Sequence, residues 1–162
     1  MFYKFMGTWK RFRSLTRSDR RVVLEAAAVI VATHAGLRIA GYRRWASFLA
    51  ALFPFGRTSE QNGIFGDAAL ADAERIARIS SGAARGLFFS PTCLERSVGL
   101  WCVLRRRGID AEIRIGGRKS AECFEAHAWV ECAGKVLNDP SDEYLGFAAF
   151  GDANAVAARL LR

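Results

Sequence analysis

The chain has 162 residues, of which 51% are hydrophobic and 25% are charged. This composition excludes intrinsic disorder, collagen and low-complexity sequence, which all contain fewer apolar side chains. The length allows one compact domain with a core and leaves little room for two independent domains. The net charge of +8 lies entirely in residues 1–60, which hold eleven basic and three acidic side chains. Such a skew is typical of a solvated helical face or of a surface that docks an acidic peptide, an acidic protein or a membrane, with nucleic acid least favoured.

The four cysteines are too few for a disulfide scaffold, and no two of them form a C-x-x-C pair. With only two histidines, no zinc-binding spacing is present, so we expect neither a metal site nor a cofactor. The apolar segment 22–40 is interrupted by Glu25, His34 and Arg38, and a bilayer core needs about 20 apolar residues. We therefore interpret this segment as a buried helix of a cytoplasmic protein with reduced thiols.

Apolar residues recur with helical spacing over the first half of the chain, and short alternating segments follow in the second half. Ser18 and Asp19 are the expected N-cap of the first long helix, which ends at about Ala40. His34 lies alone on the apolar part of this helix and is interpreted as structural. Helices followed by strands predict an α+β fold rather than alternating βαβ units. Two further helices are expected over Tyr42–Phe53 and Asp67–Ser80.

A helix over Ser90–Gly108 is the clearest element of the sequence. Either Ser90 caps it, with Pro91 in the first turn, or Thr92 caps it and Glu95 completes a capping box. In both cases Cys93 lies in the first turn, where the partial positive charge of the helix terminus stabilises a thiolate. The alternative is that Cys93 is a small apolar core residue. A buried stripe is expected at Leu94, Val98, Trp101 and Leu104.

Three short strands are predicted after this helix. Ala111–Ile115 alternates apolar and charged residues, and Ala126–Glu131 and Lys135–Asp139 flank a turn. A three-residue loop at residues 132–134 would pair Glu131 with Lys135, Trp129 with Leu137 and His127 with Asp139. A two-residue turn at residues 133–134 would shift the register by one residue. The opposite charges of Glu131 and Lys135 favour the three-residue loop, so His127 and Asp139 are expected to meet.

Cys93, His127 and Asp139 form a candidate set of nucleophile, base and orienting carboxylate. In this chemistry the imidazole takes the thiol proton, the carboxylate holds the imidazole, and the thiolate attacks a carbonyl carbon. Backbone amides at the helix start could donate to the oxyanion. The structural alternatives are a core histidine bonded to a backbone carbonyl and an aspartate that serves the turn before Pro140.

Four segments together resemble the B-type leader peptidases of lasso-peptide biosynthesis, which are transglutaminase-like cysteine peptidases. These segments are Pro91–Ser97, Leu104–Gly108, Ala126–Glu131 and Leu137–Asp139. The resemblance is strongest over residues 91–139. It implies a transglutaminase-like or papain-like fold, in which N-terminal helices precede a catalytic helix packed on a small antiparallel sheet. It also implies that Cys93, His127 and Asp139 are the catalytic triad.

The resemblance further implies what the protein acts on and with. Such peptidases cut the leader from a ribosomally made precursor, and a separate ATP-dependent cyclase then closes the ring. The discrete form, without a fused leader-recognition domain, is expected here, working with a separate recognition protein. We expect residues 1–86 to be a basic helical region that docks a partner and residues 87–162 to be the catalytic core, in one compact unit.

Two other classes of function stay open at this point. An acyltransferase or crosslinking enzyme would use the same triad, with an amine in place of water resolving the thioester. A non-catalytic module would keep the fold as a peptide platform. The remaining cysteines have no assigned base, so alanine at any of them is expected to preserve most activity. These are Cys102, Cys123 and Cys132.

Overall fold

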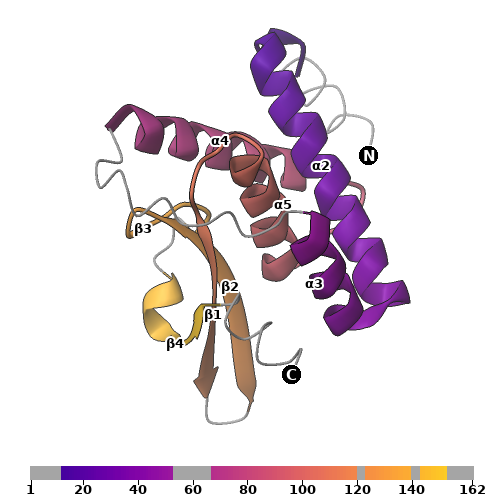
Figure 1. The fold of residues 1–162 in the computed structure, drawn as a ribbon, viewed down its shortest axis with the longest axis vertical. Coiled ribbons are helices and arrows are strands. Elements are labelled where there is room, and N and C mark those ends of the chain that lie inside the picture. Colours follow the sequence, from indigo (N-terminus) through magenta and orange to yellow (C-terminus); the bar gives the residue numbers. More distant parts are fainter. Residues whose placement is uncertain (1–11, 53–66, 120–122, 140–142, 153–162) are drawn as a thin grey trace.

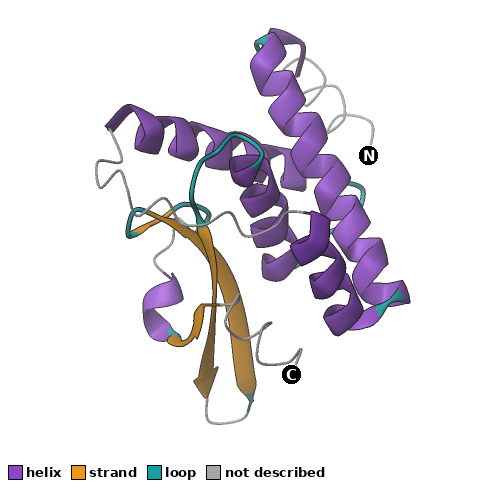
Figure 2. Ribbon diagram, viewed as in Figure 1, coloured by secondary structure: helices purple, strands orange, loops and turns teal. Residues whose placement is uncertain are grey.

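The computed structural model describes residues 12–52, 67–119, 123–139 and 143–152. Helices come first and a four-stranded antiparallel sheet follows, which confirms the predicted α+β class (Figures 1 and 2). The main elements are α2 (Arg17–Ile39), α3 (Gly41–Leu52), α4 (Asp67–Arg85), α5 (Cys93–Arg105), β1 (Glu112–Lys119), β2 (Phe124–Cys132), β3 (Lys135–Val136), a 3-10 turn η1 (Glu143–Gly146) and β4 (Ala148–Asp152).

Several helix boundaries differ from the sequence prediction, and two of these differences have a clear structural cause. The N-cap of α2 is Thr16, whose side chain accepts the backbone N–H of Asp19, so the prediction of Ser18 and Asp19 as the cap is wrong. Thr16 takes the cap because it is the residue with extended backbone angles before the first turn. Helix α4 continues beyond the expected end at Ser80 because Ala83 and Ala84 prolong its buried stripe.

Helix α5 lies at the centre of the molecule. Both α2 and α4 pack on it, and β2 packs against it as well (Figure 1). Gly99 permits the close approach of α2, since a Cβ there would lie 2.5 Å from Ile30 Cγ1. The predicted stripe faces the core, with Val98, Trp101 and Leu104 buried and Leu94 partly buried. One cluster of buried side chains therefore joins the helices to the sheet. The expected division of the chain into a docking region (residues 1–86) and a catalytic core (residues 87–162) stays a prediction.

The strand order is β3-β2-β1-β4, with antiparallel pairing throughout. Strand β1 is longer than expected and continues to Lys119, so that Gly116 lies opposite His127. A Cβ at Gly116 would lie 2.9 Å from Phe147 Cβ and 3.0 Å from Trp129 Cη2. Glycine at this position therefore lets the aromatic side chains pack tightly over β1.

The observed pairing of β2 with β3 shows that the predicted register, with a three-residue loop, is wrong. Glu131 pairs with Val136 and Cys132 with Lys135, across a two-residue turn in which Ala133 and Gly134 have φ of 50° and 76°. Two positive φ values are typical of a type I′ turn, whose twist matches that of the strands. The opposite charges of Glu131 and Lys135 were a poor guide to the register, because each of these side chains pairs with a different residue. Lys135 pairs with Glu74 of α4, and Glu131 accepts from Arg114 Nε at 3.1 Å.

Helix α2 is buried along one stripe only. Val22, Ala26 and Ile30 are buried, whereas Leu24 and Ile39 are 61% and 86% exposed. The interpretation of this segment as a buried helix is therefore correct for one face and wrong for the other. Among the described residues, α2 is the one helix long and apolar enough to cross a membrane, a property that soluble core helices and signal sequences share.

Candidate active site

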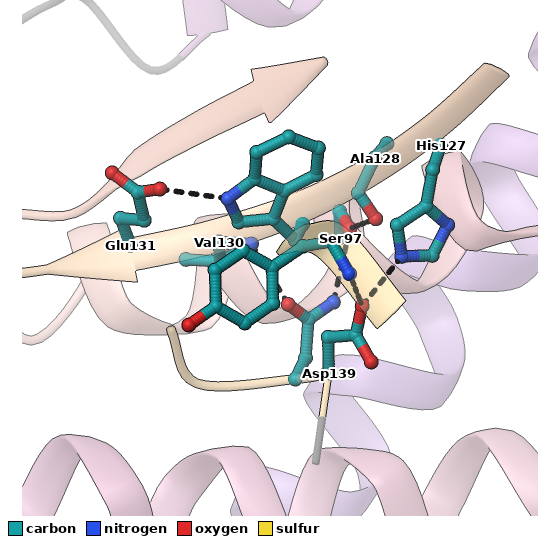
Figure 3. A network of polar contacts seen from close by, with 9 residues as sticks. Ser97, His127, Ala128, Val130, Glu131 and Asp139 are labelled. Atoms are coloured by element: carbon teal, nitrogen blue, oxygen red, sulfur yellow. Dashed lines mark hydrogen bonds and ion pairs between the residues drawn. The ribbon is translucent and has the colours of Figure 1, made fainter. Parts of the chain in front are cut away.

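His127 and Asp139 are in direct contact. His127 Nε2 lies 2.9 Å from Asp139 Oδ2, and both side chains are largely buried (Figure 3). The same carboxylate oxygen also accepts the backbone N–H of Tyr144 at 3.1 Å. A carboxylate bonded to one ring nitrogen fixes the imidazole tautomer, and it leaves the other nitrogen as a proton acceptor. The pair predicted from the sequence is thus present, although the register that led to the prediction is not.

Asp139 reaches His127 because the chain leaves the sheet just after β3. Leu137 N–H still donates to Val130 O at 2.9 Å, but Val130 N–H donates to the side chain of Asn138, at 2.7 Å from Oδ1. Asn138 therefore replaces the backbone acceptor that the ladder would supply at this pair. The ladder ends there, and the next residue is free to turn toward the imidazole.

Ser97 of α5 is hydrogen-bonded to the segment where the chain leaves the sheet. Its hydroxyl donates to Ala128 O and accepts from Asn138 Nδ2, each at 3.0 Å (Figure 3). Sequence reasoning missed Ser97 and Asn138 as positioning residues, although Asn138 precedes Asp139 in a segment that carried the resemblance. The available signal was a polar residue on the buried stripe of the helix, since buried polar side chains need partners.

Aromatic side chains surround the imidazole. The ring centroid of His127 lies 5.9 Å from that of Trp129 and 5.3 Å from that of Phe147. Trp129 Nε1 in turn donates to Glu131 Oε1 at 2.7 Å. The alternation of β2 places His127, Trp129 and Glu131 on the same face of the strand. The ring of Trp129, held by Glu131, packs against His127 and thereby limits how the imidazole can rotate.

Cys93 is the first residue of α5. Thr92 is the N-cap, and the capping box with Glu95 is complete, which decides between the two caps that the sequence left open. Cys93 and Ser97 lie one turn apart on the same side of α5, and Ser97 contacts the residue next to His127. Among the described residues no hydrogen bond joins the Cys93 thiol to His127. The structure therefore brings together two of the three predicted residues, and the full triad stays a prediction.

The other cysteines lie in different environments. Cys102 and Cys132 are buried and Cys123 is exposed, and all are free thiols. Burial raises the pKa of the Cys102 thiol to about 12, against the opposing effect of Arg106. Burial raises the pKa of Cys132 as well. Both buried cysteines are therefore protonated at neutral pH and poorly suited to act as nucleophiles.

His34 has a specific contact that sequence reasoning did not identify. Its Nδ1 lies 2.9 Å from Glu95 Oε1, at the start of the helix that carries Cys93.

In the part of the chain that the structure describes, no group of three or more His, Cys, Asp or Glu side chains is arranged to hold a metal ion.

The fold and these side chains define a class of protein. A profile of the transglutaminase-like superfamily matches residues 30–150, and the chain belongs to this superfamily, whose members are typically cysteine hydrolases. Over 51 residues the chain is also 43% identical to the Microcin J25-processing protein McjB of Escherichia coli. That alignment covers 32% of this chain and 24% of McjB, so the shared part is about a quarter of the relative. No solved structure matches the chain.

Proposed function

We propose that the protein is a cysteine peptidase that removes the leader from a ribosomally made lasso-peptide precursor. The contact between His127 and Asp139 at 2.9 Å carries the proposal, because it supplies an oriented base within a fold of the cysteine hydrolase type. The partial similarity to a microcin-processing protein supports the choice of substrate.

The proposed reaction uses Cys93 as the nucleophile. It is the first residue of α5, at the positive end of the helix dipole. His127 takes the thiol proton on the ring nitrogen that does not face Asp139, and the sulfur attacks the carbonyl carbon of the scissile bond. The imidazolium then gives its proton to the leaving amine, which leaves a thioester on Cys93. His127 finally takes a proton from water, whose oxygen attacks the thioester carbon. The C–S bond then breaks, the carboxylic acid product leaves, and the imidazolium returns the proton to the sulfur of Cys93.

The basic N-terminal helices provide the proposed docking surface. Arg17, Arg21, Arg38 and Arg44 are exposed. Large apolar side chains are exposed beside them on α2 and α3, namely Leu24, Val31, Ile39, Phe48 and Leu52. We propose that this surface binds a separate leader-recognition protein and that an ATP-dependent cyclase receives the cut core peptide. The free thiols are compatible with the proposed cytoplasmic location.

The test is to incubate the protein with a candidate precursor, with and without a recognition protein, and to weigh the products. We expect a leader fragment that carries the mass of one added water, and we expect Cys93→Ala to abolish it. Cys123→Ala is the matched control, because it removes an exposed thiol away from α5, and it should cut normally. An amine adduct in place of the hydrolysed leader would show an acyltransferase, and full processing by Cys93→Ala would refute the proposal.

The docking surface has its own test. Reversing the charges of Arg43 and Arg44 should weaken co-purification with the recognition protein and slow leader-dependent cleavage. Unchanged cleavage by that variant would show that the partner binds elsewhere.

A further inference from the structure

A second histidine–carboxylate pair lies between α2 and the start of α5. His34 comes from the C-terminal third of α2, and its Nδ1 lies 2.9 Å from Glu95 Oε1. The His34 side chain is 28% exposed, whereas that of Glu95 is 6% exposed. The described residues around Cys93 therefore include a carboxylate held from a distant part of the chain.

The same carboxylate closes the cap of α5. Glu95 Oε2 accepts the backbone N–H of Thr92 at 2.7 Å, and Thr92 Oγ1 accepts the backbone N–H of Glu95 at 3.3 Å. Cys93 lies inside this closed turn, directly after Thr92. One oxygen of Glu95 thus orders the turn that presents Cys93, and the other oxygen is bound by His34.

Removing His34 would disturb both oxygens. A buried carboxylate oxygen without a hydrogen-bond donor is unfavourable, so the side chain of Glu95 would turn toward solvent. This movement weakens the bond to Thr92 N–H and loosens the first turn. The ring of Phe89 lies 4.2 Å from that of His34 between centroids, and this packing restrains the imidazole on the chain segment that leads into α5.

We propose that His34 and Glu95 are positioning residues for Cys93, which hold the first turn of α5 in the conformation that presents the thiol. The proposal rests on the proposed function, in which Cys93 is the nucleophile. His34 itself contacts neither the substrate nor the reacting atoms. Its role is to supply one N–H donor to Glu95 from α2.

The experiment measures how fast iodoacetamide alkylates Cys93, followed by mass spectrometry in a Cys123→Ser background at pH 7. We expect His34→Ala to slow alkylation roughly fivefold to tenfold, the range of helix-terminus effects on a thiolate. His34→Phe keeps a ring against Phe89 but removes the donor, and it should show the same loss. His34→Asn places an amide N–H near the position of Nδ1, and it should restore the rate to within about twofold of the parent.

The ion pair between Glu25 and Arg107 provides a matched control. It joins α2 at 2.8 Å to the segment just after the end of α5 that is remote from Cys93. Glu25→Gln should leave alkylation unchanged. Wild-type alkylation rates in His34→Phe, failure of His34→Asn to restore the rate, or an equal loss in Glu25→Gln would each overturn the proposal. Because alkylation needs no precursor, a protein that shows these effects but cuts no leader would refute the proposed function and leave the positioning role intact.

Discussion

The two histidine–carboxylate pairs have the same length, yet they are built in different ways. His127 and Asp139 are 12 residues apart and lie on β2 and just after β3, whereas His34 and Glu95 are 61 residues apart and join two helices. The carboxylate of Asp139 accepts the backbone N–H of Tyr144 in η1, and that of Glu95 accepts the backbone N–H of Thr92, the N-cap of α5. The same pair of groups can therefore serve two purposes. In the first the imidazole is the proposed base, and in the second it is a donor that holds a helix terminus.

The largest difference between the pairs should appear when each imidazole is removed. We expect His127→Ala to lower the single-turnover rate of leader cleavage by about 10³–10⁶-fold, because the thiol then has no proton acceptor. The loss in His34→Ala should be far smaller, since the base remains. Equal losses in the two variants, with thermal unfolding unchanged, would contradict the division of roles.

A charge-neutral change at Asp139 tests the orienting carboxylate. Asp139→Asn keeps the size of the side chain, but it no longer stabilises the imidazolium, and the rate should fall by about 10²–10⁴-fold. Asp110→Asn is the control, because Asp110 is half exposed and pairs with Arg105, the last residue of α5, rather than with a histidine. Cleavage by Asp139→Asn within tenfold of the parent would show that the contact with His127 is structural.

Asn138 connects Val130 N–H to Ser97, and its removal should slow cleavage less than a change at His127 or Asp139. Asn138→Ala leaves Val130 N–H and Ser97 each without one partner, which should lower the free energy of unfolding by about 1–3 kcal/mol. Cleavage should slow as well, because Asp139 is then held less firmly. Urea unfolding and cleavage rates check both parts. Slower cleavage without lower stability would show that Asn138 also contacts the substrate.

The smallest expected effect concerns the core, away from both pairs. Burial raises the pKa of Cys102 to about 12 in the folded protein, while an unfolded thiol titrates near pH 9. Below pH 9 both states keep the proton. Above it only the unfolded state loses the proton, so the free energy of unfolding should fall by about 1.4 kcal/mol per pH unit.

Urea unfolding at pH 8 and pH 10 measures this loss. Cys102→Ala should lose about 1.4 kcal/mol less between these two values than the parent does. The exposed Cys123→Ala variant is the control and should follow the parent. Identical pH dependence in Cys102→Ala would mean that the thiol is solvated.

Local patterns predicted much of the fold. The α+β order, the start of α5 and its buried stripe all follow from spacing over a few residues, and the structure confirms them. The hairpin register failed because the ion pair assumed between Glu131 and Lys135 ignored Arg114 and Glu74, which lie elsewhere in the chain. The prediction of the α2 cap failed because Thr16, Ser18 and Asp19, within four residues, are all types that can cap a helix.

For the same reason only one of the two pairs was predictable. The hairpin places His127 and Asp139 near each other, so the sequence indicated the pair, although the exact contact depends on the departure of the chain from the sheet at Asn138. The contact of His34 with Glu95 depends on how α2 crosses α5, which Gly99 and Ile30 determine through close packing. No periodicity within either helix contains that information.

The tight turn at Ala133 and Gly134 has a consequence for how such chains can diverge. The spacing between the imidazole and its carboxylate is measured along the backbone through this turn. One inserted residue there would either lengthen the loop or shift the pairing of β2 with β3 by one residue, and such a shift moves the chain that leads to Asp139 by about 3.3 Å along the strand direction. The length of this turn therefore matters as much as the presence of Asp139 for whether His127 has a carboxylate partner.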